Sequence, residues 1–180
     1  AQMPAPRRAM MNPGYSKIVI VAHSLGAAIT RRAILDLHQM GAPWTKDVSL
    51  LLFAPAHCGA QLAALKKELV QNSGSMWLSG LSTLFAINSQ AARDLEPDGE
   101  FIKRLKADTA KAIEKASAGY LKARKVIFGL NDSVVLVERF CEDPPEDIWV
   151  NHNHTSVCKA SSEFRDPIRE VLSQLCPPPP

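Results

Sequence analysis

Short apolar runs rich in β-branched residues alternate along the chain with longer stretches in which apolar residues recur every three or four positions. Residues 17–22, 48–54 and 125–128 are dominated by apolar side chains, a pattern typical of strands buried on both faces of a parallel sheet. A weaker run at residues 147–150 predicts a fourth strand.

Residues 25–40 have the periodicity of a helix that follows the first strand. Gly41 provides a C-terminal cap, and Pro43 prevents the helix from continuing. The apolar stripe predicted to face the core consists of Leu25, Ala28, Ile29, Ile34, Leu35 and Leu37.

A last helix is predicted from Asp166 as N-cap, with Pro167 in its first turn. Its predicted buried stripe consists of Ile168, Val171, Leu172 and Leu175. Residues 60–120 read as mostly helical, and a looser apolar piece lies at 76–87. The alternation of strands and helices predicts an α/β fold with a parallel sheet, formed by a single domain over residues 1–176 and followed by a proline tail at 177–180.

Composition narrows the class of protein. The chain has 180 residues, of which 46% are apolar and 22% charged, as in an ordinary single globular domain. Lys and Arg exceed Asp and Glu by 21 − 18 = 3, and the basic residues form no stripe interleaved with aromatic residues. We therefore expect no nucleic-acid partner.

The four cysteines, at positions 58, 141, 158 and 176, have neither C-x-x-C nor zinc-finger spacing. They are interpreted as separate, mostly buried thiols. The chain contains no apolar signal segment and no apolar stretch long enough to span a bilayer, which favours the cytoplasm.

The segment VAHSLG, residues 21–26, places Ser24 between the first predicted strand and the first predicted helix. A strand–turn–helix elbow holds a nucleophilic serine in a strained conformation and requires small residues two positions before and after it, here Ala22 and Gly26. The Leu25 N–H, at the helix start, is the candidate oxyanion donor. His23 is a candidate residue of the substrate pocket. Small-x-Ser-x-Gly occurs often by chance, so the flanking strand and helix carry the prediction.

A serine nucleophile needs a base, and the base needs an orienting carboxylate. In the fold that carries such elbows, the chain order is Ser, acid, His. Asp132 is the candidate acid because it follows the third strand directly, in GLNDSVV at residues 129–135. The alternative acids are Glu138, Glu142 and Asp143.

His154, ahead of the last helix, is the candidate base, and His152 is its rival. In an extended stretch these two side chains would point to opposite sides, so only one would face Ser24. The H-x-H pair also resembles a metal pair, but no third ligand accompanies it, and we expect no metal. His57 and Cys58 could suggest a cysteine nucleophile, although neighbouring side chains diverge.

Four segments resemble α/β-hydrolase esterases and lipases of the group that includes the GPI-inositol-deacylase-like and SERAC-like serine hydrolases. They are VAHSLG (21–26), LFAPAHCGA (52–60), ARDLEPDGEF (92–101) and HTSVCK (154–159), and the resemblance that they carry extends over roughly residues 17–175. The last resembles the His-x-x-Ile-Cys-Lys-Pro segment of that group, which implies that His154 is the base. The chain departs from the group's pattern at Ala22, Ala60, Gly99 and Ala160.

The resemblance implies an α/β-hydrolase fold whose segment 60–120 forms a helical cap. Two roles are open for the apolar residues of this cap, lining an acyl-chain pocket or packing the cap against the sheet: Met76, Trp77, Leu78, Leu81, Leu84 and Phe85. A complete fold of this kind has strands before the nucleophile strand, which also supply a second oxyanion N–H. We therefore expect the chain to be the C-terminal part of a longer hydrolase, with the nucleophile strand at the edge of its sheet.

The function predicted from these residues is hydrolysis of a carboxylic ester by a Ser24–His154–Asp132 triad without a cofactor. The partner is a small-molecule or lipid ester, and a lipid substrate implies transient contact with a membrane surface. A degenerate hydrolase module that binds a protein or ligand is an alternative prediction. Acyl transfer to an alcohol or thiol is a second alternative, because it uses the same residues.

Overall fold

The computed structural model describes residues 15–61, 64, 94, 96–97, 99–116 and 119–176. Its strands are β1 (Ile18–His23), β2 (Val48–Phe53), β3 (Ala123–Gly129) and β4 (Asp147–Trp149). Its α-helices are α1 (Leu25–Gln39), α5 (Glu100–Ala116) and α6 (Asp166–Leu175). The 3₁₀ turns are η2 (Pro43–Asp47), η3 (Ala56–Cys58) and η4 (Gly119–Leu121).

The strands form one sheet in the order β1-β2-β3-β4, and every neighbouring pair is parallel. Parallel neighbours require connections that cross back over the sheet, so all four strands end at the same edge. The segments that follow the strands therefore gather at this carboxyl edge. The predicted α/β class, the parallel sheet and the four strand positions are confirmed.

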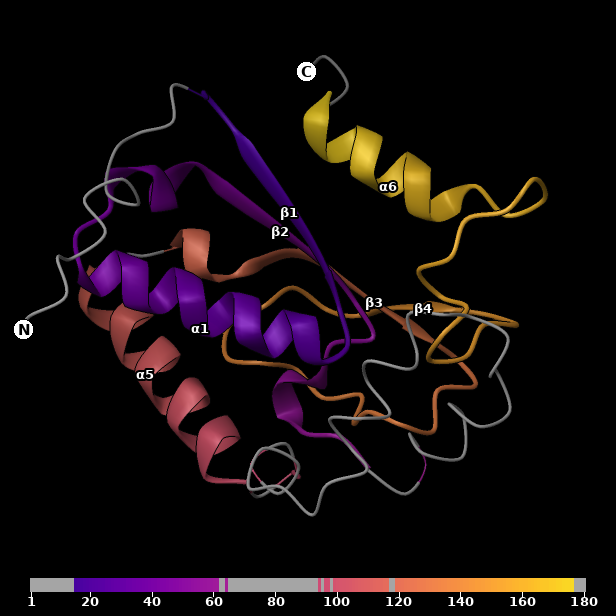
Figure 1. Ribbon diagram of the computed structural model, residues 1–180, viewed down its shortest axis with the longest axis horizontal. Coiled ribbons are helices and arrows are strands. Elements are labelled where there is room, and N and C mark those ends of the chain that lie inside the picture. The colour runs from indigo at the N-terminus through magenta and orange to yellow at the C-terminus, as the bar shows by residue number, and fades with distance from the viewer. Residues whose placement is uncertain are drawn as a thin grey trace, which may run out of the picture.

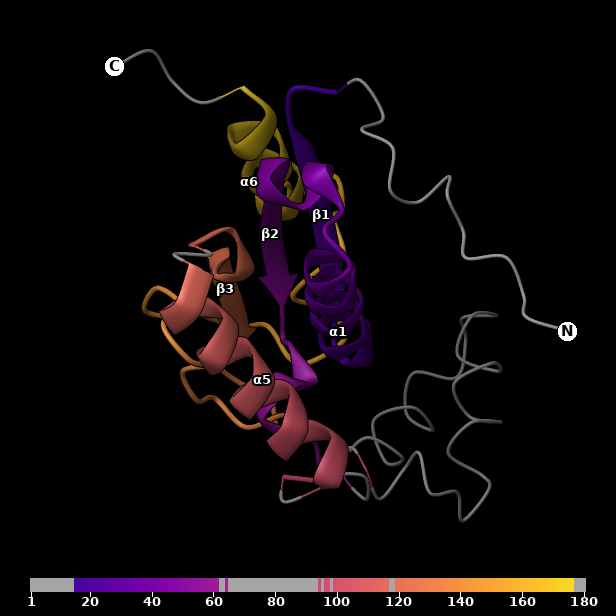
Figure 2. The ribbon, with the colours of Figure 1, turned by 90° about the vertical axis from the view of Figure 1, so that its left-hand side faces the viewer.

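Helices cover both faces of the sheet. Helices α1 and α5 contact each other, whereas α6 contacts β1. Figures 1 and 2 show that α6 lies on the opposite side of β1 from α1. The connections from β1 to β2 and from β2 to β3 contain α1 and α5, whereas α6, on the other side, follows the last strand, β4.

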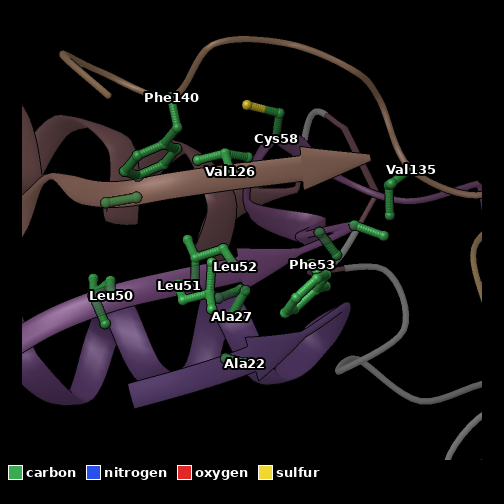
Figure 3. Close-up of a cluster of buried hydrophobic side chains, with 14 of the residues drawn as sticks. Ala22, Ala27, Leu50, Leu51, Leu52, Phe53, Cys58, Val126, Val135 and Phe140 are labelled. Atoms are coloured by element: carbon green, nitrogen blue, oxygen red, sulfur yellow. The ribbon is translucent and has the colours of Figure 1, made fainter. Parts of the chain in front are cut away.

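Strand β2 is the centre of the hydrophobic core. Leu50, Leu51, Leu52 and Phe53 are each at most 1% exposed, and Figure 3 shows their side chains among those contributed by the neighbouring strands and α1. Fully burying one such side chain contributes about 1.5–3 kcal/mol to folding. The VSLLLF sequence of β2 lacks alternation because both faces of this strand are covered.

A second buried group, here called the arginine cluster, consists of Arg31, His57, Phe140 and Asp143. The guanidinium of Arg31 forms an ion pair with Asp143, and its Nε–H donates to His57 Nδ1 at 3.1 Å. Phe140 stacks on the His57 ring and also lies under the guanidinium. Burial lowers the pKa of Arg31 and raises the pKa of Asp143, while their mutual attraction opposes both shifts.

The cluster corrects the stripe predicted for α1. Ile29 is 56% exposed, and Arg31 is buried instead, with 3% of its surface accessible. Arg31 tolerates burial because its charge is paired with Asp143 and its other donors are used. The predicted cap is confirmed: Gly41 has a φ of 77° and its N–H donates to the His38 carbonyl.

Helix α6 also differs from the prediction. Its N-cap is Arg165 and not Asp166, which is the first helical residue. Three residues of its predicted buried stripe, Ile168, Leu172 and Leu175, are about half exposed, and only Val171 packs against the core. The periodicity predicted the helix correctly, but the apolar face of α6 is only partly covered by described residues.

All four cysteines are free thiols, but only Cys58 is buried. Cys141 and Cys158 are half-buried and Cys176 is exposed, so the prediction of mostly buried thiols was wrong. Among the described residues, no helix is long and apolar enough to cross a membrane. The apolar piece at 76–87, with the acyl-pocket residues predicted in it, lies outside the described residues.

Candidate active site

Ser24 occupies a strained turn between β1 and α1. Its φ of 53° and ψ of −128° are unusual for a residue with a side chain, and such conformations cost about 1–3 kcal/mol. The surrounding backbone holds it there. The Ser24 N–H donates to the Phe53 carbonyl at 3.1 Å, and the Ser24 carbonyl accepts from the N–H groups of Ala27 and Ala56.

The small residues around Ser24 have different surroundings. Ala22 is buried against the core, as the elbow requires. A Cβ on Gly26, by contrast, would meet nothing within 4 Å among the described residues outside its chain neighbours and the backbone of its own helix. Any need for glycine at position 26 therefore comes from the turn itself and not from packing against another described element.

Asp132 lies in the turn that follows β3, and its two carboxylate oxygens have separate partners. Oδ1 accepts from the N–H groups of Val134 and Val135 at 2.9 and 3.2 Å. Oδ2 lies 3.0 Å from Nδ1 of His154. The first set of bonds is an ordinary Asx turn, and it leaves Oδ2 free to orient a histidine.

His154 joins the other two predicted residues. Its Nε2 lies 2.9 Å from Ser24 Oγ, and its side chain is only 1% exposed. The Asp132 carboxylate accepts a hydrogen bond from Nδ1–H, which keeps the proton of the neutral ring on Nδ1. The unprotonated Nε2 can then accept a hydrogen bond from the Ser24 hydroxyl. The three residues, called the triad below, thus form one hydrogen-bonded chain that joins the ends of β1, β3 and β4.

The rival histidine, His152, has a different place. Its ring stacks on Phe164 with centroids 3.9 Å apart, and its carbonyl accepts from the Asn131 N–H. This carbonyl also lies against Gly129, where an added Cβ would come within 2.3 Å of it. Gly129 therefore allows the loop of His154 to approach the loop of Asp132.

Sequence reasoning missed this role of Gly129. The only signal for it was a glycine at the end of a buried strand, which is also the ordinary mark of a strand ending. The turn that carries His154 is tightened by Asn153, whose Oδ1 accepts from the N–H groups of Thr155 and Ser156. Asn153 itself could have predicted this turn, because an asparagine side chain often accepts from backbone N–H groups two and three positions later.

Leu25 and His23, the residues on either side of Ser24, were predicted to supply an oxyanion donor and to line the substrate pocket. Leu25 is the first residue of α1, where N–H groups lack partners within the helix and the helix dipole favours negative charge. The His23 Nε2 lies 2.7 Å from the carbonyl oxygen of His154. His23 also lines an apolar pocket of about 320 Å³ with residues of β1, β2 and α6, among them Val21, Phe53, Ile168, Val171 and Leu172.

The alternative candidates have other partners. Glu142 pairs with Lys122, and Asp143 belongs to the arginine cluster. Burial raises the pKa of the Cys58 thiol to about 11, so it remains protonated at neutral pH and is a poor nucleophile. No group of metal-ligating side chains that could hold an ion occurs among the described residues.

Comparison with known proteins leaves the family of this chain open. No protein-family model matches it, and neither curated proteins nor solved structures contain a match. The resemblance to α/β-hydrolase esterases therefore stays a prediction. What the structure adds is an α/β fold with a parallel sheet and, at its carboxyl edge, a buried constellation of serine, histidine and aspartate.

Proposed function

We propose that this chain is a serine hydrolase of the α/β-hydrolase fold that cleaves carboxylic esters. One observation carries the proposal: a serine in a strained strand-to-helix turn lies within hydrogen-bond distance of a histidine whose other nitrogen meets a buried carboxylate. Nucleophile, base and orienting acid are what acyl transfer through a serine requires.

The proposed reaction has two halves. Ser24 Oγ attacks the acyl carbonyl carbon and its proton passes to His154 Nε2. The bond to the alcohol oxygen then breaks as His154 returns the proton to that oxygen. In the second half, a water molecule gives a proton to His154 and attacks the acyl-enzyme, and the acid leaves as Ser24 recovers its proton.

Two charges develop during each half of the reaction, a positive charge on the His154 ring and a negative charge on the former carbonyl oxygen. The imidazolium of His154 is stabilised by the Asp132 carboxylate at 3.0 Å. The oxyanion forms beside Ser24, where the Leu25 N–H at the positive end of α1 serves as a donor.

Labelling with a fluorescent fluorophosphonate tests the proposal, because this reagent reacts with activated serines. We expect the parent chain to be labelled and both Ser24→Ala and His154→Ala to lose the label. Ser173→Ala is the matched control, because this exposed α6 serine bonds only to its own helix. Hydrolysis of p-nitrophenyl butyrate is expected to fall by about 10⁶-fold in Ser24→Ala.

A folded parent chain, verified by circular dichroism, that neither takes the label nor hydrolyses the ester would contradict the proposal. The same outcome would favour a module that binds a partner without catalysis.

A further inference from the structure

The residue just before the nucleophile makes a contact that the reaction scheme above does not use. His23 Nε2 lies 2.7 Å from the backbone carbonyl oxygen of His154, across 131 positions of the chain. A carbonyl oxygen can only accept, so His23 carries a proton on Nε2 and donates it. The bond thus ties the end of the nucleophile strand to the backbone of the catalytic base.

Both ends of this bond are held by other contacts. His23 is the last residue of β1 and pairs with Phe53 of β2. The neighbouring Ser24 N–H donates to the Phe53 carbonyl. On the other side, the loop of His154 rests on Gly129 through His152 and is closed by the Asn153 turn. The bond from His23 therefore links the end of β1 to the loop that carries His154 after β4.

We propose that His23 is a positioning residue of the catalytic base: by holding the His154 carbonyl, it keeps His154 Nε2 within reach of the Ser24 hydroxyl. This inference rests on the proposed hydrolase function. Motion of one ångström between reacting groups can cost a hundredfold in rate, and the Nε2–Oγ distance of 2.9 Å leaves little room for such motion.

His23 fits this role because it stays uncharged. Its pKa is lowered from 6.5 to about 4, chiefly by burial and also by the nearby His154 and Lys159, while the bond to the His154 carbonyl and the charge of Asp132 offset part of this shift. The ring centroids of His23 and His154 are 4.8 Å apart. A charged His23 would oppose the imidazolium that forms on His154 in each half-reaction, whereas a neutral one supplies a donor without that cost.

The inference is tested with His23→Leu, which removes the donor, and His23→Gln, whose side-chain amide places a donor at a similar reach. With p-nitrophenyl butyrate as substrate, we expect His23→Leu to lower kcat by about 10–100-fold with KM nearly unchanged. We expect His23→Gln to recover most of kcat. Thermal unfolding of both variants separates a loss of positioning from a loss of fold.

A second measurement reads His154 directly and does not depend on turnover. In protein labelled with ¹⁵N at histidine, the His154 ring nitrogens report its tautomer and its bond to Asp132, and they are assigned by their loss in His154→Ala. We expect these signals to shift or broaden in His23→Leu and to return in His23→Gln.

The positioning role is overturned if His23→Leu leaves both kcat and the His154 nitrogen signals unchanged, or if His23→Gln is as impaired as His23→Leu. Failure of the proposed function looks different: the parent chain is then neither labelled nor active, while the nitrogen signals still report whether His23 orients His154.

Discussion

The molecule contains two buried histidines whose Nδ1 atoms face opposite charges. His57 of the arginine cluster and His154 of the triad are each 1% exposed, and each bonds through Nδ1 to a group that carries a full charge. For His154 this group is the Asp132 carboxylate, and for His57 it is the Arg31 guanidinium.

The sign of that neighbouring charge separates a base from a structural group. A carboxylate at Nδ1 stabilises the positive ring that forms when Nε2 takes a proton. A guanidinium at Nδ1 opposes it, and together with burial it holds the pKa of His57 well below its usual range. On the proposed mechanism, the charge beside Nδ1 therefore suits His154, and not His57, to the role of base.

The comparison between the triad and the arginine cluster is tested most directly by neutralising Asp132 and Asp143 separately. Asp132→Asn keeps a carbonyl oxygen for Val134 and Val135 but presents an amide N–H to His154, which favours the wrong tautomer. We expect kcat for p-nitrophenyl butyrate to fall about 10⁴-fold with the fold intact. Asp143→Asn is the matched control, and its folded fraction is expected to retain kcat.

In the arginine cluster, removing the aspartate is expected to reduce stability and not activity. Asp143→Ala leaves the Arg31 charge buried without its partner, and breaking a buried pair in this way costs about 3–5 kcal/mol. Urea denaturation, monitored by circular dichroism, measures the loss of unfolding free energy. A cost below about 1 kcal/mol would show that the Arg31 charge does not need this carboxylate.

The pH dependence of stability depends on the part-buried His23 and on the buried His57, because the pKa of each is lowered in the folded protein. His23 has a pKa of about 4 in the folded protein against 6.5 in the unfolded chain. Between these values the unfolded chain binds a proton that the folded protein does not, so the unfolding free energy falls as pH drops from 6.5 towards 4. The loss attributable to His23 is about 3 kcal/mol. His57, whose pKa is also lowered, acts in the same direction.

Urea unfolding of the parent chain and His23→Gln at several pH values isolates this contribution. The variant is expected to lose less stability than the parent between pH 6.5 and 4. Parallel curves for the two proteins would mean that His23 titrates equally in both states.

The smallest effect on stability is expected at Gly129, where the loops that carry Asp132 and His154 approach each other. In Gly129→Ala the new Cβ would meet the His152 carbonyl at 2.3 Å, so the His154 loop must move. We expect a loss of about 1–3 kcal/mol in unfolding free energy and a lower kcat. Gly119→Ala is the control, because a Cβ there meets no described residue within 4 Å. Equal kcat in both variants would remove Gly129 from the positioning of the triad.

Much of the α/β frame was predictable from local pattern. The β-branched and leucine-rich runs predicted β1, β2 and β3 to within two residues, because buried parallel strands need apolar side chains on both faces. The elbow predicted the position of Ser24, and the order of strands predicted which later loops would supply Asp132 and His154.

Hydrophobic periodicity predicted the helices more accurately than it predicted which of their side chains are buried. It predicted α1 and α6 but assigned Ile29, Ile168 and Leu172 to the core, where none of them lies. A helical stripe shows which residues share a face, but the exposure of that face depends on what packs against it. Arg31 reverses the expectation for the same reason, since its burial depends on Asp143, which lies 112 positions away.

The sequence by itself determined the strands, helices α1 and α6 and the candidate nucleophile Ser24, because these follow from side-chain pattern and from a short motif at a strand end. Only the tertiary structure decided which histidine faces Ser24, which aspartate faces a histidine, and that His23 reaches the His154 carbonyl. The physical reason is distance along the chain. Contacts between residues more than 20 positions apart arise when parallel strands align their ends, and no local preference encodes the direction in which each side chain then points.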